Sequence, residues 1–254
     1  MAGSHIHALY RHQPGPLHAS ASQVKLAGTL LFVLAVVATP REAFWAFGAL
    51  AGMLVVLTAA ARIPPGFVLR RLVVEVPFVL FAVFLPLVGI GERVQVLGMS
   101  LSVAGLWAAW NIVAKATLGA WASILLAATT QVPDLLDAFR RLRAPRVITS
   151  IMGFMIRYLD VIVGEWNRMW VALRSRGYRP RSLRNARPLA AASGSLFIRS
   201  YERGERVYLA MLSRGYRGEM PELGPSGAAA GQWLAAAAVV ATAAIIAALG
   251  WVTR

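Results

Sequence analysis

The sequence predicts an all-α, polytopic membrane protein with about five transmembrane helices and one cytoplasmic helical domain. The chain is 58% hydrophobic, with a mean hydropathy of +0.61, which is too apolar for an ordinary soluble domain. Its apolar residues lie in blocks long enough to cross a bilayer, and its charged residues lie between and after those blocks. Together these patterns indicate membrane spans joined by charged loops.

Four expected spans lie within residues 23–130, and a fifth lies within residues 227–254. Proline and arginine separate them, as at Pro40-Arg41 and at the breaker Pro64-Pro65-Gly66. The segment GIGERVQVLGMS is expected to be a short turn before the fourth span. The spans are predicted at 24–39, 43–61, about 72–90, 101–130 and 228–252.

Residues 1–22 are predicted to be a flexible tail, because small residues, prolines and histidines fill them. No cleavable signal peptide is expected, since more than twenty residues of this kind precede the first apolar run. The tail contains every histidine of the chain: His5, His7, His12 and His18. No carboxylate accompanies them, so a solvated tail is favoured over metal binding.

The loop charges orient the spans. Arg62, Arg70 and Arg71 lie between the second and third spans, and residues 131–226 hold 17 arginines, no lysine and 8 carboxylates. The positive-inside rule predicts that both regions and the N-terminus are cytoplasmic. We expect a multi-pass protein of the cell (inner or plasma) membrane. The net charge of +15 fits such loops, contact with anionic lipid and docking to acidic grooves. No nucleic-acid partner is therefore expected.

The residues that most catalytic mechanisms need are missing from this sequence. It has no cysteine, no histidine beyond His18 and no glycine-rich phosphate loop with a Lys-Ser/Thr pair. Asp134-Leu-Leu-Asp137 resembles half of a prenyl-diphosphate site, but carboxylates in a helix's first turn are ordinary partners of its dipole. We therefore predict a non-catalytic chain with no catalytic residue, no cofactor and no metal site.

Three polar residues within the spans need an explanation. Lys115 and Asn111 share one face of the fourth span, and an intramembrane lysine is by default a functional hypothesis. Contact with a partner helix, or extension toward the membrane surface, is favoured over a role in a transport path. Glu75, near the start of the third span, is expected to pair with Arg71 four residues earlier.

The strongest signal is a repeat in the arginine-rich segment. Residues 168–178 read RMWVALRSRGY, and residues 206–216 read RVYLAMLSRGY. The copies end two predicted helices, at about 147–176 and 188–214, and a short amphipathic helix, VPDLLDAFRRL, precedes both. The shared positions are Arg168/Arg206, Ala172/Ala210, Ser175/Ser213, Arg176/Arg214, Gly177/Gly215 and Tyr178/Tyr216.

Each copy is suited to present an arginine at the end of a helix. Gly177 and Gly215 stand where a left-handed residue would end the helix, which leaves Arg176 and Arg214 in its last turn. A guanidinium there can pair with the carboxylates and carbonyls of a groove. The apolar stripe behind each end is expected to bury against its own domain. The stripes comprise Trp166, Met169, Trp170 and Leu173 in the first copy and Val207, Tyr208 and Met211 in the second.

A plain helix cap would explain one copy, since arginine near a helix C-terminus complements the dipole. It does not explain why the arginine, alanine, serine and tyrosine return in a second copy. One chain that presents the same surface to two equivalent sites is therefore favoured. Ala172 and Ala210, four residues before the arginines, would let another surface approach closely.

These features resemble the transmembrane T component of energy-coupling factor (ECF) transporters, in particular the cobalt-type CbiQ subgroup. The resemblance covers most of the chain and is most specific in the two Ser-Arg-Gly-Tyr ends and in SLFIRSYERGERVYLAMLSRGYRGEMP (195–221). LHASASQVKLAGTLLFV (17–33) is similar to the family's opening segment, with Gln23-Val24 in place of the usual Pro-Arg. TTQVPDLLDAFRRLRAP (129–145) is similar to the family's first coupling-domain helix.

The resemblance implies a non-catalytic coupling subunit. It implies that residues 131–226 form a cytoplasmic coupling domain, that two ABC-type ATPase subunits hydrolyse ATP, and that a CbiM/CbiN-like S component binds the substrate in the membrane. Cobalt is the substrate of the subgroup, and nickel is equally compatible. The residues implied for ATPase docking are Ala172, Ser175, Arg176, Gly177, Ala210, Ser213, Arg214 and Gly215.

Two other classes of function stay open on the residues alone. A stand-alone channel or secondary carrier rests on Lys115 and Asn111, although such carriers usually repeat their spans. A membrane-surface scaffold would bind through anionic lipid and would be removed by high salt.

Overall fold

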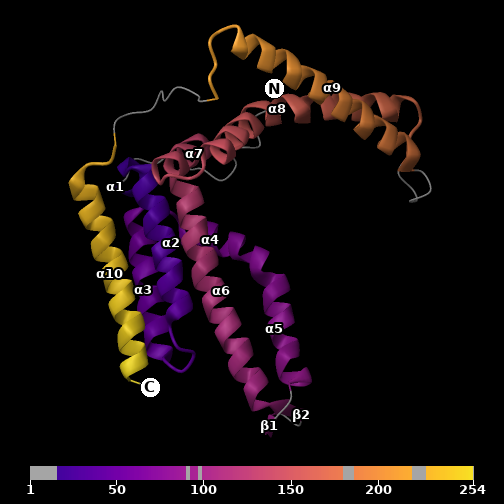
Figure 1. Cartoon of the computed structure of the whole chain (residues 1–254). Coiled ribbons are helices and arrows are strands. Elements are labelled where there is room, and N and C mark those ends of the chain that lie inside the picture. The colour runs from indigo at the N-terminus through magenta and orange to yellow at the C-terminus, as the bar shows by residue number, and fades with distance from the viewer. Residues whose placement is uncertain (1–15, 90–91, 97–98, 180–185, 219–226, 254) are drawn as a thin grey trace. The chain divides into compact units, whose positions relative to one another are not determined.

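The computed structural model describes residues 16–89, 92–96, 99–179, 186–218 and 227–253. Within these ranges the chain is helical apart from one hairpin and the connecting turns, which confirms the all-α fold class (Figure 1). The elements are α1 Pro16–Ala19, α2 Ser22–Ala38, α3 Phe44–Ala60, α4 Pro65–Leu72, the 3-10 helix η2 Val73–Glu75, α5 Val76–Val88, β1 Arg93–Val96, β2 Met99–Ser102, α6 Val103–Thr129, α7 Val132–Arg141, α8 Arg146–Ser175, α9 Arg187–Leu212 and α10 Ala230–Val252. His5, His7 and His12 of the predicted tail lie outside the described residues, whereas His18 lies in α1.

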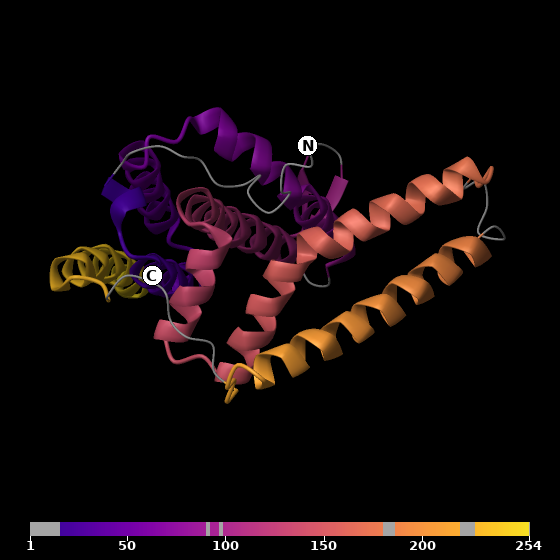
Figure 2. The ribbon, with the colours of Figure 1, turned by 90° about the horizontal axis from the view of Figure 1, so that it is seen from above.

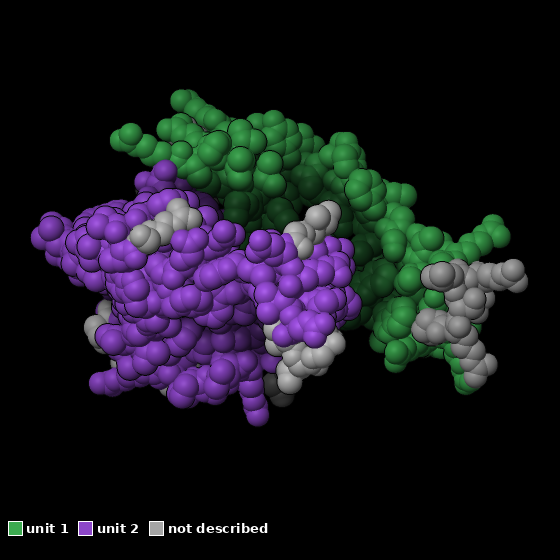
Figure 3. Space-filling view, turned by 90° about the horizontal axis from the view of Figure 1, so that it is seen from below, with its two compact units in different colours: residues 1–8, 143–225 green, residues 9–142, 226–254 purple. Residues whose placement is uncertain are grey.

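Contacts within the chain divide it into two compact units, which Figure 3 colours separately. The first comprises residues 1–8 and 143–225 and contains α8 and α9. The second comprises residues 9–142 and 226–254 and contains the other helices and the hairpin. Helix α7 packs against α2 in this second unit. The boundary defined by contacts therefore falls after α7, whereas the change in composition falls before it.

The second unit is a helix bundle whose core lies between α2, α3, α6 and α10. Figures 1 and 2 show these helices side by side, and α2 contacts both α6 and α10. Their sequences are apolar around most of the helix, so each can bury one side and keep the other apolar. The buried core residues are Phe32, Ala35, Val36, Phe47, Leu50, Leu54, Leu118, Ala122 and Ala243.

The outer faces of this bundle are apolar and exposed. Helix α5 packs against α6 but leaves Phe78, Phe81 and Phe84 each more than half exposed. Soluble proteins rarely expose contiguous apolar patches of this kind, whereas lipid chains can cover them. The exposure pattern therefore indicates a multi-pass membrane protein.

Among the described residues, four helices are long and apolar enough to cross a membrane: the continuous helix Pro65–Val88, α6, α8 and α10. Three of them coincide with expected spans, although Pro65–Val88 begins before the predicted start near residue 72. Helices α2 and α3 match the other two expected spans, with 17 residues each, near the lower limit for a crossing. Helix α8 also qualifies by length and composition, although no span was expected there.

A β-hairpin replaces the short turn expected between the third and fourth spans. Strand β1 pairs antiparallel with β2, with Arg93 opposite Ser102. Each strand has only four residues, and an apolar/polar alternation this short cannot be distinguished from a loop. The sequence therefore did not predict these strands. Ser102 then caps α6, because its hydroxyl oxygen accepts a hydrogen bond from the Gly105 backbone N–H at 3.3 Å.

Close packing of α5 against α6 requires glycine at position 105. A methyl group there would lie 2.5 Å from the backbone oxygen of Leu85 and 2.7 Å from the Cα of Pro86. Gly105→Ala is therefore expected to destabilise the bundle by about 1–3 kcal/mol, because the two helices must move apart. Gly119→Ala is the matched control in the same helix, since its methyl group would meet no atom within 4 Å. Equal thermal unfolding of the two variants in detergent would contradict this prediction.

Candidate functional site

The first arginine-bearing helix end, at the end of α8, closes with a backbone motif around Gly177. The Tyr178 N–H donates to the Leu173 carbonyl, and the Gly177 N–H donates to the Arg174 carbonyl, each at 3.0 Å. This pair of bonds is a Schellman motif, which needs a left-handed residue, and Gly177 supplies it with φ +80°. Arg176 is the C-cap, so it stands at the limit of the helix.

The second arginine-bearing end, at the end of α9, repeats the same motif. The Tyr216 N–H donates to the Met211 carbonyl, and the Gly215 N–H donates to the Leu212 carbonyl, again at 3.0 Å. Gly215 has φ +83°. The repeat in sequence is thus a repeat in backbone geometry, and the predicted left-handed glycines are confirmed at both ends.

Both ends are open to a partner. The Ser175 hydroxyl donates to the Val171 carbonyl at 3.0 Å, and the Ser213 hydroxyl donates to the Ala210 carbonyl at 2.9 Å, so each serine satisfies its own helix end. Within the described ranges, no hydrogen bond or ion pair engages the guanidinium of Arg176 or Arg214. The residues predicted for docking are all exposed: Ala172, Ser175, Arg176, Gly177, Ala210, Ser213, Arg214 and Gly215.

The two ends lie far apart, because α8 and α9 run antiparallel in one helix pair (Figures 1 and 2). Glu165, in the second half of α8, contacts Arg199 of α9. Phe154, near the start of α8, and Met211, near the end of α9, line the same cleft. The end of α9 therefore lies beside a point about 20 residues before the end of α8. At a rise of about 1.5 Å per residue, the arginine-bearing ends are roughly 30 Å apart.

Glu165 joins the two helices through ion pairs with two arginines. Its carboxylate lies 2.9 Å from Nη2 of Arg203 and 3.4 Å from Nη1 of Arg199, and the glutamate itself is buried. Burial acts to raise its pKa, but the hydrogen bonds and charges of the two arginines outweigh it and hold the pKa of Glu165 below its ordinary value. The carboxylate is therefore ionised at neutral pH, and the link between the helices is intact.

The expectation that the apolar stripes bury against their own domain is met only in part. In the first copy the stripe is half-buried, and the contacts of the Trp170 ring, with Trp166 at 6.3 Å and Tyr178 at 6.0 Å between centroids, lie within the same helix end. In the second copy the stripe lines an open cleft of about 350 Å³ beside α8, and Tyr208 stays 52% exposed. A stripe is buried only where another element covers it, and the described part of this unit holds α8 and α9 alone.

The two lysines of the chain both donate to the carboxyl end of a neighbouring helix. Lys25, in the first turn of α2, donates to the carbonyls of Thr129 at 2.8 Å and His18 at 3.4 Å. Lys115, in α6, donates to the carbonyl of Val37 near the end of α2 at 2.7 Å. The last carbonyls of a helix lack partners within it and carry the negative end of its dipole. Helices α2 and α6 therefore hold each other reciprocally.

This geometry confirms the expectation that Lys115 contacts a partner helix. The sequence did not single out Lys25 as a contact residue, because it stands at the start of an apolar run. One signal was present, since the chain has only two lysines and otherwise uses arginine. The buried Oδ1 of Asn111 accepts no hydrogen bond from the described residues. Asn111 and Lys115 therefore do not form a polar pair that would support the carrier hypothesis.

Lys115→Met is expected to lower the free energy of unfolding by about 1 kcal/mol, because the Val37 carbonyl loses its donor at membrane depth. Lys115→Arg keeps a charged donor and should recover part of that loss. Thermal unfolding of the purified chain measures both variants. If Lys115 instead lined a transport path, Lys115→Met would unfold at the wild-type temperature but would lose uptake, and that result would contradict the prediction.

Two acidic residues outside the helix pair have partners in their own surroundings. Asp137 lies 3.7 Å from Arg140 in α7, and Glu75 accepts a hydrogen bond from the Thr117 hydroxyl of α6 at 2.7 Å. The guanidinium of Arg71, the partner expected for Glu75, lies over the Phe67 ring at 3.8 Å from its centroid. In the part of the chain that the structure describes, no three histidine, aspartate or glutamate side chains gather closely enough to hold a metal ion.

Fold and site together define a class of protein: a polytopic helical membrane protein that carries one arginine-bearing helix end twice, on a separate helix pair. The sequence matches the family CbiQ, described as cobalt transport protein, over residues 14–223. The chain therefore belongs to the CbiQ family, as the resemblance in its sequence predicted.

Its relatives match over shorter stretches. An uncharacterised protein of Methanocaldococcus jannaschii is 36% identical over 104 residues, which are 41% of this chain and 39% of that protein. A Methanocorpusculum labreanum protein, whose name describes a fused cobalt transport protein CbiMQ, is 26% identical over 145 residues, 55% of this chain and 24% of that one. The energy-coupling factor transporter transmembrane protein EcfT of Brevibacillus brevis is 31% identical over 107 residues, 38% and 40% of the two chains.

Proposed function

We propose that this chain is the membrane-embedded T component of an ECF-type ABC importer, which couples two ATPase subunits to a substrate-binding S component. The observation that carries the proposal is the pair of like Schellman ends, each with an exposed arginine immediately before its left-handed glycine. A two-fold pair of ATPases offers the same groove twice, so one asymmetric chain needs two like ends to engage both. Membership of the CbiQ family and the likeness to EcfT support it.

Each arginine-bearing end docks in a groove of one ATPase. The Schellman bonds already fix the backbone that carries the arginine, so little conformational entropy is lost on docking. Arginine stays charged, and its planar fork pairs with carboxylates and backbone carbonyls. The separation of roughly 30 Å, from about 20 residues at about 1.5 Å each, keeps the two ends from competing for one groove.

Helices α8 and α9 lie along the cytoplasmic surface, and the helix bundle lies in the membrane. Arg157 and Asp160 oppose a crossing by α8, because charged side chains are costly at membrane depth. The arginine-rich composition of this segment places it on the cytoplasmic side. The exposed apolar residues Val147 and Ile151 give α8 a side that suits contact with the membrane surface.

The mechanism is mechanical. ATP-driven closure of the ATPase pair moves the two arginine-bearing ends, and the link at Glu165 makes α8 and α9 move together. The helix pair passes this motion to the S component, which reorients and releases its substrate inward. No covalent chemistry is assigned to this chain.

Cobalt is the proposed substrate. Nickel is the alternative, because its divalent ion has similar coordination chemistry. The description of the CbiQ family supports cobalt. The name of the Methanocorpusculum labreanum relative joins CbiM to CbiQ, which supports a CbiM-like S component as the membrane partner. In this scheme the metal binds to the S component, and the T component transmits force.

Co-purification of the tagged chain from its native membranes tests this function. We expect an ATPase and a small membrane protein to elute with it, and the latter to identify the substrate by its bound metal. Elution of the chain alone would overturn the proposal. Reconstitution of the purified chain in liposomes supplies the opposite control, because a stand-alone channel or carrier would show ion flux there and a T component would not.

A further inference from the structure

The helix bundle contains a cavity that the coupling function does not use. It has a volume of about 310 Å³ and lies between α1, α2, α3, α6 and α10. Small-ligand sites typically measure roughly 300–1,000 Å³, so this space is large enough to hold part of a molecule. All of these helices belong to the membrane-embedded unit.

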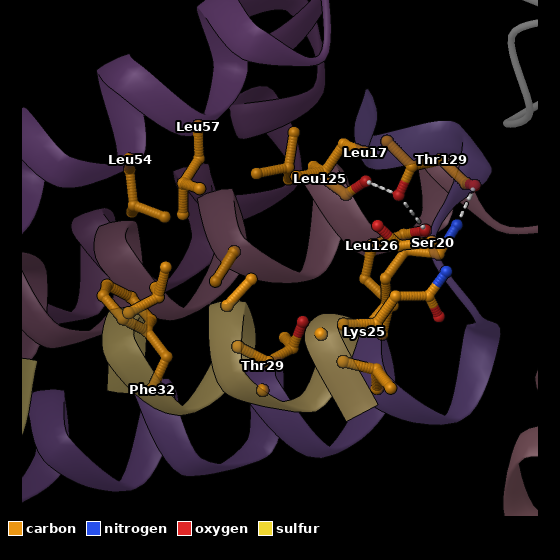
Figure 4. Close-up of a pocket in the computed structure, with 18 residues that line it drawn as sticks. Leu17, Ser20, Lys25, Thr29, Phe32, Leu54, Leu57, Leu125, Leu126 and Thr129 are labelled. Atoms are coloured by element: carbon orange, nitrogen blue, oxygen red, sulfur yellow. Dashed lines mark hydrogen bonds between the residues drawn. The ribbon is translucent and has the colours of Figure 1, made fainter. Parts of the chain in front are cut away.

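The two ends of the cavity differ in chemistry, as Figure 4 shows. One end is walled by the apolar side chains of Phe32, Leu54 and Leu57. The other end holds the Lys25 ammonium and the polar groups of Ser20 and Thr129. A cavity with one charged end and one apolar end fits an amphiphile, whereas a sugar or nucleotide needs polar groups along its length.

Lys25 gives the polar end its positive charge. An ammonium has three N–H donors, and the hydrogen bonds to Thr129 and His18 account for two of them, which leaves one for a ligand. Asp134 is the carboxylate whose charge acts on Lys25, and it lies in α7 outside the cavity wall.

The charge also suits the leaflet in which this end lies. The Lys25 end of the cavity meets the C-terminus of α6, which leads into α7 and the arginine-rich segment. In the orientation proposed above, that end faces the cytoplasmic leaflet, which is where anionic lipids concentrate. We propose that the cavity binds one acyl chain of an anionic phospholipid, with the lipid phosphate beside Lys25.

Native mass spectrometry of the full chain in detergent, with added phosphatidylglycerol or phosphatidylcholine, tests the site. We expect one retained phosphatidylglycerol per chain. Ala235→Phe, which places a ring in the cavity wall, should abolish this retention. Ala237→Phe is the matched control, since it adds the same ring to the same helix at an exposed residue that does not line the cavity.

The contact between Lys25 and the lipid headgroup is tested by replacing each of the two lysines in turn with glutamine. Lys25→Gln should reduce the preference for phosphatidylglycerol over phosphatidylcholine about tenfold, because the positive charge that favours a net-negative headgroup over a zwitterionic one is lost. Lys115→Gln should leave that preference unchanged, because Lys115 does not line the cavity.

Two results would overturn the proposal. Equal retention of both lipids by the wild type would contradict selectivity for an anionic headgroup, and equal retention by Ala235→Phe and Ala237→Phe would mean that lipid binds outside the cavity. Lipid retention is measured on the chain alone, so its failure is separable from failure of ATPase docking.

Discussion

Replacing Arg176 and Arg214 together by glutamate is expected to abolish assembly with the ATPases and, with it, uptake. In the proposed docking, each reversal places a carboxylate where a groove lined by carboxylates and carbonyls would hold a guanidinium, at a cost of about 2–5 kcal/mol of docking free energy. Either single variant should keep one working end and lose less, because the other end still tethers the ATPase pair. Co-purification of the ATPases and metal uptake by cells measure the effect.

The repeat itself supplies a matched control for this experiment. Arg168→Glu with Arg206→Glu makes the same charge change at a second pair of shared, exposed arginines, two helical turns before the ends. That variant should assemble and take up substrate almost as the wild type does. Full uptake by the Arg176/Arg214 double variant, or an equal loss in both double variants, would show that the ends are helix caps and no more.

Glu165→Ala is expected to uncouple the two helix ends while leaving both able to dock. Among the described residues of this unit only Thr149 and Glu165 are buried, so the ion pairs to Arg199 and Arg203 carry much of the contact between α8 and α9. Removal of the carboxylate also leaves Arg199 and Arg203, four residues apart on α9, without the negative charge that pairs with both of them. The ATPases should therefore still co-purify with the variant, whereas uptake driven by their ATP hydrolysis should be lost.

Glu202→Ala is the control for the loss of a carboxylate from this helix pair. Glu202 is exposed and lies 3.9 Å from Arg206 on the same helix, and such pairs contribute about 0.3–0.5 kcal/mol. Its uptake should match the wild type. Loss of the ATPases from the Glu165 variant would mean instead that the ion pairs are needed for docking itself.

The same link predicts how acid affects the helix pair. The pKa of Glu165 is lowered in the folded protein, so its contribution is fully present above the ordinary glutamate pKa and is lost as the pH falls through the lowered value. The α8–α9 contact should therefore persist at neutral pH and loosen only in acid. Glu165→Gln should lack that acid transition when inter-helix distance is followed by spin labels.

Local chemistry explains how much the sequence could predict. Five apolar runs predicted the spans because a membrane helix needs its apolar residues within one continuous segment. The paired glycines at 177 and 215 predicted left-handed caps because only glycine adopts positive φ at low cost, and both have it. The duplicated arginine-bearing ends led to the CbiQ family by the same local signal.

Contacts between distant residues were decided by the tertiary structure alone. The reciprocal bonds of Lys25 to Thr129 and of Lys115 to Val37 join residues 104 and 78 positions apart, so no local pattern predicts them. The antiparallel packing of α8 on α9, which sets the distance between the arginine-bearing ends, depends on Glu165 reaching across to Arg203. The sequence by itself determined which residues end each helix, since caps and periodicity are properties of neighbouring residues. Only the folded chain decided what those ends and charges face, because partners across helices are chosen by packing.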